Sequence, residues 1–250
     1  MSPMAAMLFR EGKIRATNVT FVFWDLFYPL CYLLVFGVGV TSALGSPGSA
    51  PGTGYNDFFL AGVLGIASFG IASNSSWSFF MDRDNGIFFE MLTYPMSRAQ
   101  YLLGKMLANV FVGMVQAAIT LVLGSWLLKI HLRLDLLPVL WAAVVVGTAG
   151  WFFFYTIFAL KIRRNDLFNS VTSIFYFVFL FASSIFYPLE PLPRWFRGIA
   201  LVNPITWQVD LLRYGSIGLG SPRQVVAEAV AFALFCTACF VYSVHSLNRE

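Results

Sequence analysis

The chain has 250 residues, of which 58% are hydrophobic and only 11% are charged, and its mean hydropathy is +0.74. Soluble globular domains are about half apolar and about a quarter charged, so this composition excludes that class and predicts an integral membrane protein. The net charge of +4 does not indicate nucleic-acid binding, because with so few charges their position relative to the membrane matters more than their sum.

Long apolar stretches recur along the chain, and each is long enough to cross the hydrocarbon layer of about 30 Å as a helix. All must be helices, because unpaired backbone groups cannot face lipid, and runs such as WFFFYTIFAL (151–160) lack the alternating polarity of a β-barrel strand. The sequence therefore predicts one all-α transmembrane domain over 1–250. Its six predicted spans are approximately 19–41, 57–81, 101–128, 137–160, 167–187 and 223–245.

The positions of lysine and arginine predict the orientation of these spans, because positive residues collect on the cytoplasmic side of a membrane. With the N-terminus in the cytoplasm, ten of the 16 lysines and arginines fall on the inner side and six on the outer side. The cluster Arg10, Lys13 and Arg15 and the link KIRRND (161–166) contribute most of this difference. Both termini are therefore predicted to be cytoplasmic, in a multi-pass protein of the inner (plasma) membrane.

Two acidic residues fall within predicted spans, where charge is costly and often functional. Asp25 lies about two turns into the first span and Glu228 about one turn into the sixth. Each either contacts a substrate pathway or gate, or lies at headgroup level or hydrogen-bonded between helices, and both interpretations stay open. Lys105 is expected to extend back to the cytoplasmic interface. No acid or histidine is expected at mid-membrane, so the sequence predicts no internal proton relay.

The run IFYFVFLFASSIFY (174–187) is denser in aromatic residues than an interfacial aromatic belt requires. Phe175 and Phe179 in this run are candidates to line a path for an apolar or glycosylated substrate, because aromatic faces offer contacts of low specificity. Packing against lipid is the alternative interpretation of the same residues.

The segment between the fifth and sixth spans, 187–222, is rich in proline, tryptophan and aliphatic residues and too apolar for a solvated loop. Its apolar pieces are too short to span, so we expect re-entrant or interfacial helices that enter the outer leaflet. The alternative is one spanning helix over 198–220, which Pro204 and three glycines would interrupt.

No catalytic or nucleotide-binding motif is apparent. The pairs Gly12-Lys13 and Gly104-Lys105 lack the preceding glycine and the following Ser or Thr of a phosphate-binding P-loop. Cys236 and Cys239 lie three apart on one helical face, but no further metal ligand is near them in the sequence, so we interpret them as small packing residues. The sequence predicts no catalytic residue, no metal site and no cofactor bound by this chain.

The loop DRDNGIFFEMLTYPMSRAQYLLGKML (82–107) resembles the cytoplasmic loop of the ABC-2 family of transporter permeases. The matching elements are Asp82, Arg83, Asp84, Gly86, the helix 87–93, Pro95, Ser97 and Arg98. The outer segment YPLEPLPRWFRGIALVNPITWQVDLLR (187–213) is similar to the family's outside motif. Its matching residues are Pro188, Leu192, Pro193, Trp195, Asn203, Pro204, Ile205, Thr206 and Arg213. The family often has Thr-Leu-Glu after the loop glycine, where this chain has IFFE (87–90), which leaves the identity of the partner open.

This resemblance implies the permease subunit of an ATP-driven exporter for a hydrophobic or amphipathic substrate, such as a drug-like molecule, a lipid or a lipid-linked glycan. It implies two paired permease chains, a homodimer rather than a heterodimer, in contact with membrane lipids and without nucleic acid. An ATP-binding subunit, which holds ATP and Mg, docks under each chain.

The resemblance also assigns residues. Helix 87–93 would enter a cleft of the ATPase, and 7–15 would form an interfacial helix at the inner membrane surface. The implied coupling residues are Gly86, Phe88, Phe89, Glu90, Met91 and Leu92. The implied outer gate comprises Pro188, Pro193, Trp195, Asn203, Pro204 and Arg213.

Two other functions remain possible on the sequence. One is an ATP-independent secondary transporter, which the absence of a visible inverted repeat disfavours. The other is a membrane assembly scaffold. Transport that depends on a partner's ATPase would distinguish the ATP-driven exporter from both of these alternatives. In the dimer, we expect the glycine pairs 37/39, 62/65 and 147/150 to mark close helix contacts.

Overall fold

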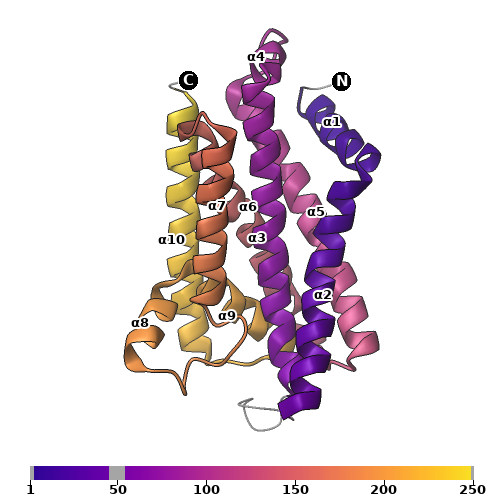
Figure 1. Ribbon diagram of the computed structural model, residues 1–250, viewed down its shortest axis with the longest axis vertical. Coiled ribbons are helices and arrows are strands. Elements are labelled where there is room, and N and C mark those ends of the chain that lie inside the picture. Colours follow the sequence, from indigo (N-terminus) through magenta and orange to yellow (C-terminus); the bar gives the residue numbers. More distant parts are fainter. Residues whose placement is uncertain (1–2, 45–53, 249–250) are drawn as a thin grey trace.

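The computed structural model describes residues 3–44 and 54–248, and every regular element in these ranges is a helix. The all-α prediction is confirmed for this part of the chain. The long helices run side by side along the longest dimension of the molecule (Figure 1). They are α2 (Val19–Leu44), α3 (Tyr55–Asp84), α5 (Arg98–Leu127), α6 (Leu137–Lys161), α7 (Asn165–Phe181) and α10 (Pro222–Leu247).

Four stretches of the described chain are long and apolar enough to cross a membrane. They are Tyr55–Asp84, Arg98–Leu127, Leu134–Lys161 and Pro222–Leu247. The described residues of α2 and α7 contribute shorter apolar helices, Phe23–Gly39 and Asn165–Phe181. The predicted fifth span, 167–187, is shorter than expected, because α7 ends at Phe181 and turns follow. Six membrane crossings therefore stay a prediction.

Helix α3 forms the centre of the bundle and packs against α2, α5, α6 and α9 (Pro204–Ile217). In its most apolar window 83% of the residues are buried, against 28% for α10. The difference assigns α3 to the protein interior and leaves α10 at the periphery, where lipid supplies its apolar surroundings.

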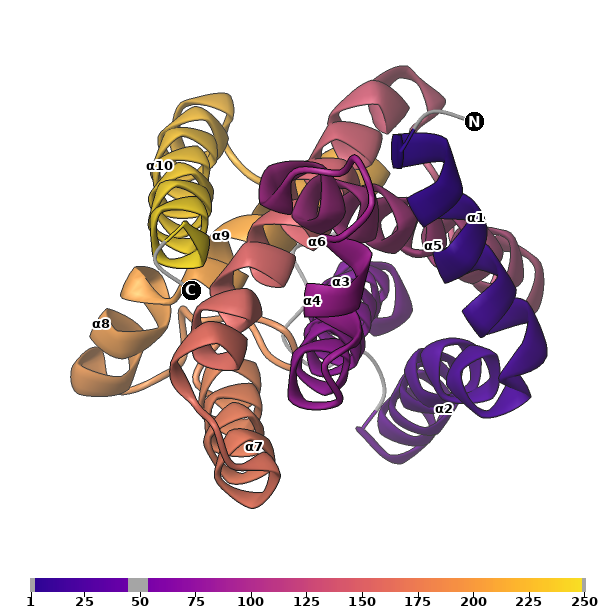
Figure 2. The same cartoon turned by 90° about the horizontal axis from the view of Figure 1, so that it is seen from above.

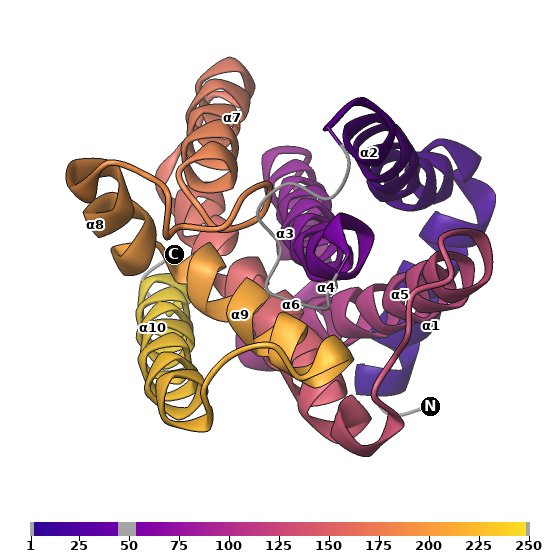
Figure 3. The same ribbon diagram turned by 90° about the horizontal axis from the view of Figure 1, so that it is seen from below.

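The two ends of the bundle differ. Helix α1 (Pro3–Thr17), the end of α10 and the short α4 (Ile87–Met91) lie at one end, which we call the inner end (Figures 1 and 2). Helices α8 (Arg194–Val202) and α9 lie at the opposite, outer end, as does the short η1 (Leu134–Leu136) after α5 (Figure 3). The predicted cytoplasmic location of both termini stays a prediction. Arg249, counted on the inner side, lies outside the described residues.

The outer segment is not one continuous helix over 198–220, because α8 and α9 meet at a break at Asn203. The Asn203 side chain accepts a hydrogen bond from the backbone N–H of Ile205 and caps α9. Its amide donates to the carbonyls of Phe179 and Ala182, at 2.8 and 2.7 Å. Pro204 at the first position of α9 fits this start. One side chain thus begins α9 and fastens it to the end of α7.

The predicted glycine contacts lie within the chain and not between two chains. A Cβ at Gly150 would lie 2.1 Å from the Sγ of Cys236, and one at Gly65 would lie 2.6 Å from Val209. Gly62 and Gly147 face Ile185 and Gln208 in the same way, and Gly37 faces Asn56. The prediction of dimer contacts is therefore wrong for these five glycines. Around Gly39 there is open space, so it alone of the six can approach another molecule.

Replacing Gly150 with alanine should destabilise the protein by about 1–3 kcal/mol, because α6 and α10 must separate to admit the new methyl group beside Cys236. Thermal unfolding of the purified chain measures this loss. Gly39→Ala is the matched control, since the added methyl group meets nothing. A second substitution, Cys236→Ala, should recover part of the loss; equal stability of both glycine variants would contradict the close packing of α6 on α10.

Candidate functional site

Helix α4 at the inner end begins after a sharp turn. Gly86 there has a φ of 77°, in the left-handed region that glycine enters at no steric cost. The turn directs Phe88 back into the bundle, where it is fully buried against the rings of Phe79 and Tyr101. Phe89, the next residue, is 45% exposed. Helix α4 thus has one side fixed to this chain and one side free.

The predicted coupling residues divide between these two sides. Phe88 does not offer an apolar contact to a partner as expected, because its ring is inside this chain. Met91 and Leu92 are half-buried against the core, while Phe89, Glu90 and Gly86 are exposed. Tyr94, which the sequence analysis did not single out, is 62% exposed beside them. We call Phe89, Glu90 and Tyr94 the α4 surface.

Next to α4 lies an inner charge cluster, formed by Arg10 and Glu11 of α1, Asp82 of α3, and Tyr101 and Lys105 of α5. Asp82 is its centre. Arg10 donates to the two carboxylate oxygens of Asp82 at 2.7 and 3.0 Å, and the Nζ of Lys105 lies 2.8 Å from the same group. The hydroxyl of Tyr101 also donates to Asp82.

Lys105 is held within this cluster. Its side chain is 1% exposed, with Nζ 3.0 Å from Glu11 and 3.0 Å from the hydroxyl of Ser78, and the expected extension to the cytoplasmic interface stays a prediction. The two cations and two anions of the cluster balance, which makes their burial tolerable. Burial lowers the pKa of the Arg10 guanidinium, but the hydrogen bonds and charge of Asp82 outweigh it and raise that pKa. The cluster holds α1, α3 and α5 together at the root of α4.

Two further arginines bind the ends of this loop to other helices. Arg83, at the end of α3, donates to the carbonyls of Leu160 and Ile162 at 2.8 and 2.6 Å, where α6 ends. Arg98, the first residue of α5, donates to the carbonyl of Leu247 at the end of α10. Charged hydrogen bonds therefore join both ends of this loop to α6 and α10.

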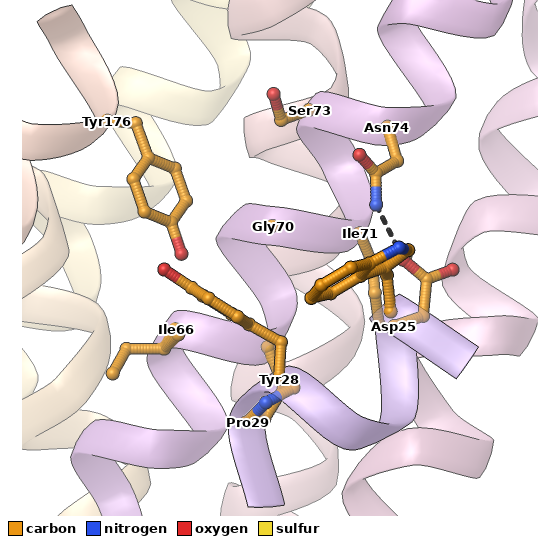
Figure 4. A pocket seen from close by; sticks show the side chains of 11 residues that line it. Asp25, Tyr28, Pro29, Ile66, Gly70, Ile71, Ser73, Asn74 and Tyr176 are labelled. Atoms are coloured by element: carbon orange, nitrogen blue, oxygen red, sulfur yellow. Dashed lines mark hydrogen bonds between the residues drawn. The ribbon is translucent and has the colours of Figure 1, made fainter. Parts of the chain in front are cut away.

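A second feature is a cavity of about 210 Å³ between α2, α3 and α7 (Figure 4). Asp25 on its wall is buried, accepts a hydrogen bond from the amide of Asn74 at 2.7 Å, and forms an ion pair with Arg15. It is thus hydrogen-bonded between helices, one of the two interpretations open on the sequence. The hydroxyl groups of Tyr28 and Tyr176 point toward one another across the cavity (Figure 4).

A larger cavity of about 490 Å³ shares Tyr28, Ser73, Asn74 and Tyr176 with the first. Because the two adjoin, we treat them as one inner groove, defined by these four residues. It lies between α2 and α7, which flank α3 on either side (Figures 2 and 3). Apolar side chains and hydroxyl and amide groups line it together, and its carboxylate, from Asp25, is paired with Arg15.

Phe175 and Phe179 do not line this groove. Phe175 packs on the rings of Phe154 and Phe158, and Phe179 packs on Phe154 and Trp151. Both phenylalanines therefore join α7 to α6, and the prediction that they line a substrate path has no support from their position. The α7 residues that line the groove are instead Phe168, Asn169, Thr172, Ser173, Tyr176 and Phe177.

The third feature is an outer cavity of about 770 Å³ among the beginning of α3, the turns after α7, and helices α8, α9 and α10. Of the residues predicted for an outer gate, Pro188 and Arg213 line it, and Glu228 joins them there. Trp195 is 69% exposed on α8. Pro193 begins α8, while Asn203 and Pro204 form the break before α9.

Most of the chain matches one family model, which describes the ABC-2 type transporter and covers residues 4–217. The protein ycf38 of Pyropia yezoensis, named as a transport permease, is 23% identical over 222 residues, or 83% of this chain and 74% of that protein. The inner membrane transport permease YadH of Escherichia coli is 26% identical over 221 residues, or 82% of this chain and 81% of YadH. "Probable multidrug ABC transporter permease YbhR" of the same species is 24% identical over 164 residues, or 65% of this chain and 44% of YbhR.

Proposed function

Because this chain belongs to the family of ABC-2 type transporters, we propose that it is the membrane subunit of an ATP-driven exporter. The chain carries no nucleotide site of its own, and a separate subunit binds ATP and Mg and hydrolyses ATP. The inner end faces the cytoplasm, and one such subunit docks there under each of two permease chains.

The observation that carries this proposal is the two-sided arrangement of α4. Its exposed α4 surface is free to enter a cleft in another protein, and its buried Phe88 fixes the helix to the bundle. Closure of the ATPase pair moves α4. The inner charge cluster passes that motion to α1, α3 and α5, while Arg83 passes it to α6. A helix pair moved through such stiff contacts shifts as a rigid body.

The inner groove is the proposed entry for the substrate. It lies between two apolar helices and is lined by both apolar side chains and hydroxyl and amide groups, which suits a molecule with both polar and apolar parts. A relative is named as a multidrug permease, which supports a substrate of this amphipathic class. A second copy of the chain closes the groove, and the break between α8 and α9 forms the outer gate.

A photo-crosslinking residue in place of Phe89 tests the docking of the ATPase in native membranes. We expect capture of an ATP-binding protein encoded separately, because Phe89 is exposed on α4 and its neighbour Phe88 holds the helix in place. The same probe at Leu192, at the outer end, is the control and should capture no ATPase. Capture of lipid alone at Phe89, or of the same protein from both positions, would contradict the proposal.

A further inference from the structure

The outer cavity contains a carboxylate with an open hydrogen-bonding position. Glu228 on α10 is 8% exposed, and one of its oxygens accepts a hydrogen bond from Gln224 at 2.8 Å. Its other oxygen, Oε2, is shielded from solvent and has no hydrogen-bond partner among the described residues. A buried carboxylate oxygen without a donor is costly, so this position favours a donor supplied from outside the chain.

The buried arginine of this cavity is already committed elsewhere. Arg213 forms an ion pair with Asp210, donates to the carbonyl of Ser184 at 2.8 Å, and lies 3.8 Å over the ring of Phe58. Its guanidinium therefore donates to groups of this chain, and its planar face is covered by the Phe58 ring. Glu228 receives no direct contact from it.

The charge of the cavity is negative on balance. Three carboxylates line it, from Glu190, Asp210 and Glu228, and two guanidinium groups, from Arg197 and Arg213. The sum is −1. Between them the lining is mostly apolar, with leucine, valine and proline side chains and the ring of Phe58. Such a site pairs an apolar wall with one open acceptor and excess negative charge.

We propose that the outer cavity binds amphipathic amines: the Glu228 side chain rotates so that its unpaired Oε2 accepts a hydrogen bond from the protonated amine, and the apolar body lies against the leucine and proline side chains. The volume of about 770 Å³ is in the range of sites for drug-sized molecules. The identification of these amines as the transported substrates rests on the proposed export function. Binding itself requires no ATPase, so it can be tested separately from the capture of a partner at Phe89.

Photoaffinity labelling of the purified full chain in phosphatidylcholine nanodiscs tests this site, with a diazirine-bearing dodecylamine as the probe. Mass spectrometry should locate the label on residues that line the outer cavity. Unlabelled dodecylamine should compete about tenfold better than dodecanol, because only the amine forms a charged hydrogen bond. Glu228→Gln should weaken the amine about tenfold and leave the weaker dodecanol unchanged.

Asp166→Asn is the matched control, because it also removes one acidic charge but lies exposed at the inner end, paired with Arg164. It should leave labelling unchanged. A second variant, Leu219→Trp, fills the cavity without altering Glu228 and should block the amine, which keeps the test decisive if Glu228→Gln does not fold. Equal competition by dodecanol, labelling that Glu228→Gln or Leu219→Trp leaves intact, or loss of labelling in Asp166→Asn would overturn the site.

Discussion

Replacing Asp82 with asparagine should destabilise the permease by about 3 kcal/mol, because breaking a buried ion pair leaves its partner charge uncompensated. Asp82 is 6% exposed, and its carboxylate serves both Arg10 and Lys105. Glu11 still contacts both cations, so the cluster loses one of its two anions and keeps an excess positive charge. Thermal or denaturant unfolding of the purified chain measures the loss.

The control for this prediction is two residues away. Asp84→Asn removes the same charge from the end of the same helix, but its side chain is exposed and the change should cost little. A compensating change tests the cause: Lys105→Met added to Asp82→Asn restores neutrality, since Arg10 and Glu11 then remain as a pair. Part of the lost stability should return. Equal stability of Asp82→Asn and Asp84→Asn would show that the cluster contributes nothing.

The same substitution should act on transport beyond its effect on stability. The cluster joins α1, α3 and α5 next to α4, so its loss loosens the path from a docked ATPase to the bundle. With the partner complex reconstituted, ATP hydrolysis should continue while transport falls. A variant that loses stability far from α4, such as Gly150→Ala, should lower both in proportion to the folded protein.

The membrane class and the helix-rich fold could be predicted because hydropathy is local. Each long apolar stretch specifies a helix within its own residues, and helix ends follow from neighbouring side chains. The break at Asn203 is one such case, since the Asn-Pro pair that begins α9 is visible in the sequence. The short helix α4 could be predicted because the residues of the loop 82–107 resemble a family motif that is contiguous in sequence.

The inner charge cluster could not be predicted in this way. Its members come from three helices, and what brings them together is the packing of α1 on α5, where Met7 lies against Gly104. From the sequence around Lys105 alone, the cytoplasmic interface was the expected position of its ammonium group. A lysine one to two turns inside a helix, facing an acid at the end of the preceding antiparallel helix, is the signal that was available.

The glycines show the same limit in another form. Small residues at helical spacing predict a close approach but do not say which helix approaches. Gly150 meets Cys236 and Gly65 meets Val209, both far along the same chain. The aromatic run of α7 shows an equivalent limit, because the density of rings does not reveal that Phe175 and Phe179 pack on α6.

The neighbouring phenylalanines of α4 should separate folding from coupling. Phe88→Ala should cost about 3–5 kcal/mol of stability, because the ring is fully buried against Phe79 and Tyr101 and its removal leaves a cavity. Phe89→Ala should change stability by less than about 1 kcal/mol, since its ring is 45% exposed. Unfolding of the two purified variants gives the comparison directly.

The affinity for the ATP-binding subunit should be affected in the opposite order: Phe89→Ala should lower it more than Phe88→Ala. An exposed aromatic ring that enters a partner's pocket is a typical hot spot, and its truncation costs about 2 kcal/mol or more of binding, close to thirtyfold in affinity. Phe89→Ala should therefore remain folded and lose the ATPase in a pull-down, together with transport. Phe88→Ala, measured at a temperature where enough remains folded, should lose less of the ATPase per folded molecule.

The adjacent positions make the result interpretable. Both substitutions remove the same ring from the same short helix, so a difference between them reports only the direction in which each side chain points. If Phe89→Ala retains the partner at full affinity, α4 is a cytoplasmic turn and does not couple the ATPase. If both variants lose stability equally, α4 does not present one side to the bundle and the other to a partner. The proposed transmission of motion from the ATPase through the inner charge cluster would then be contradicted.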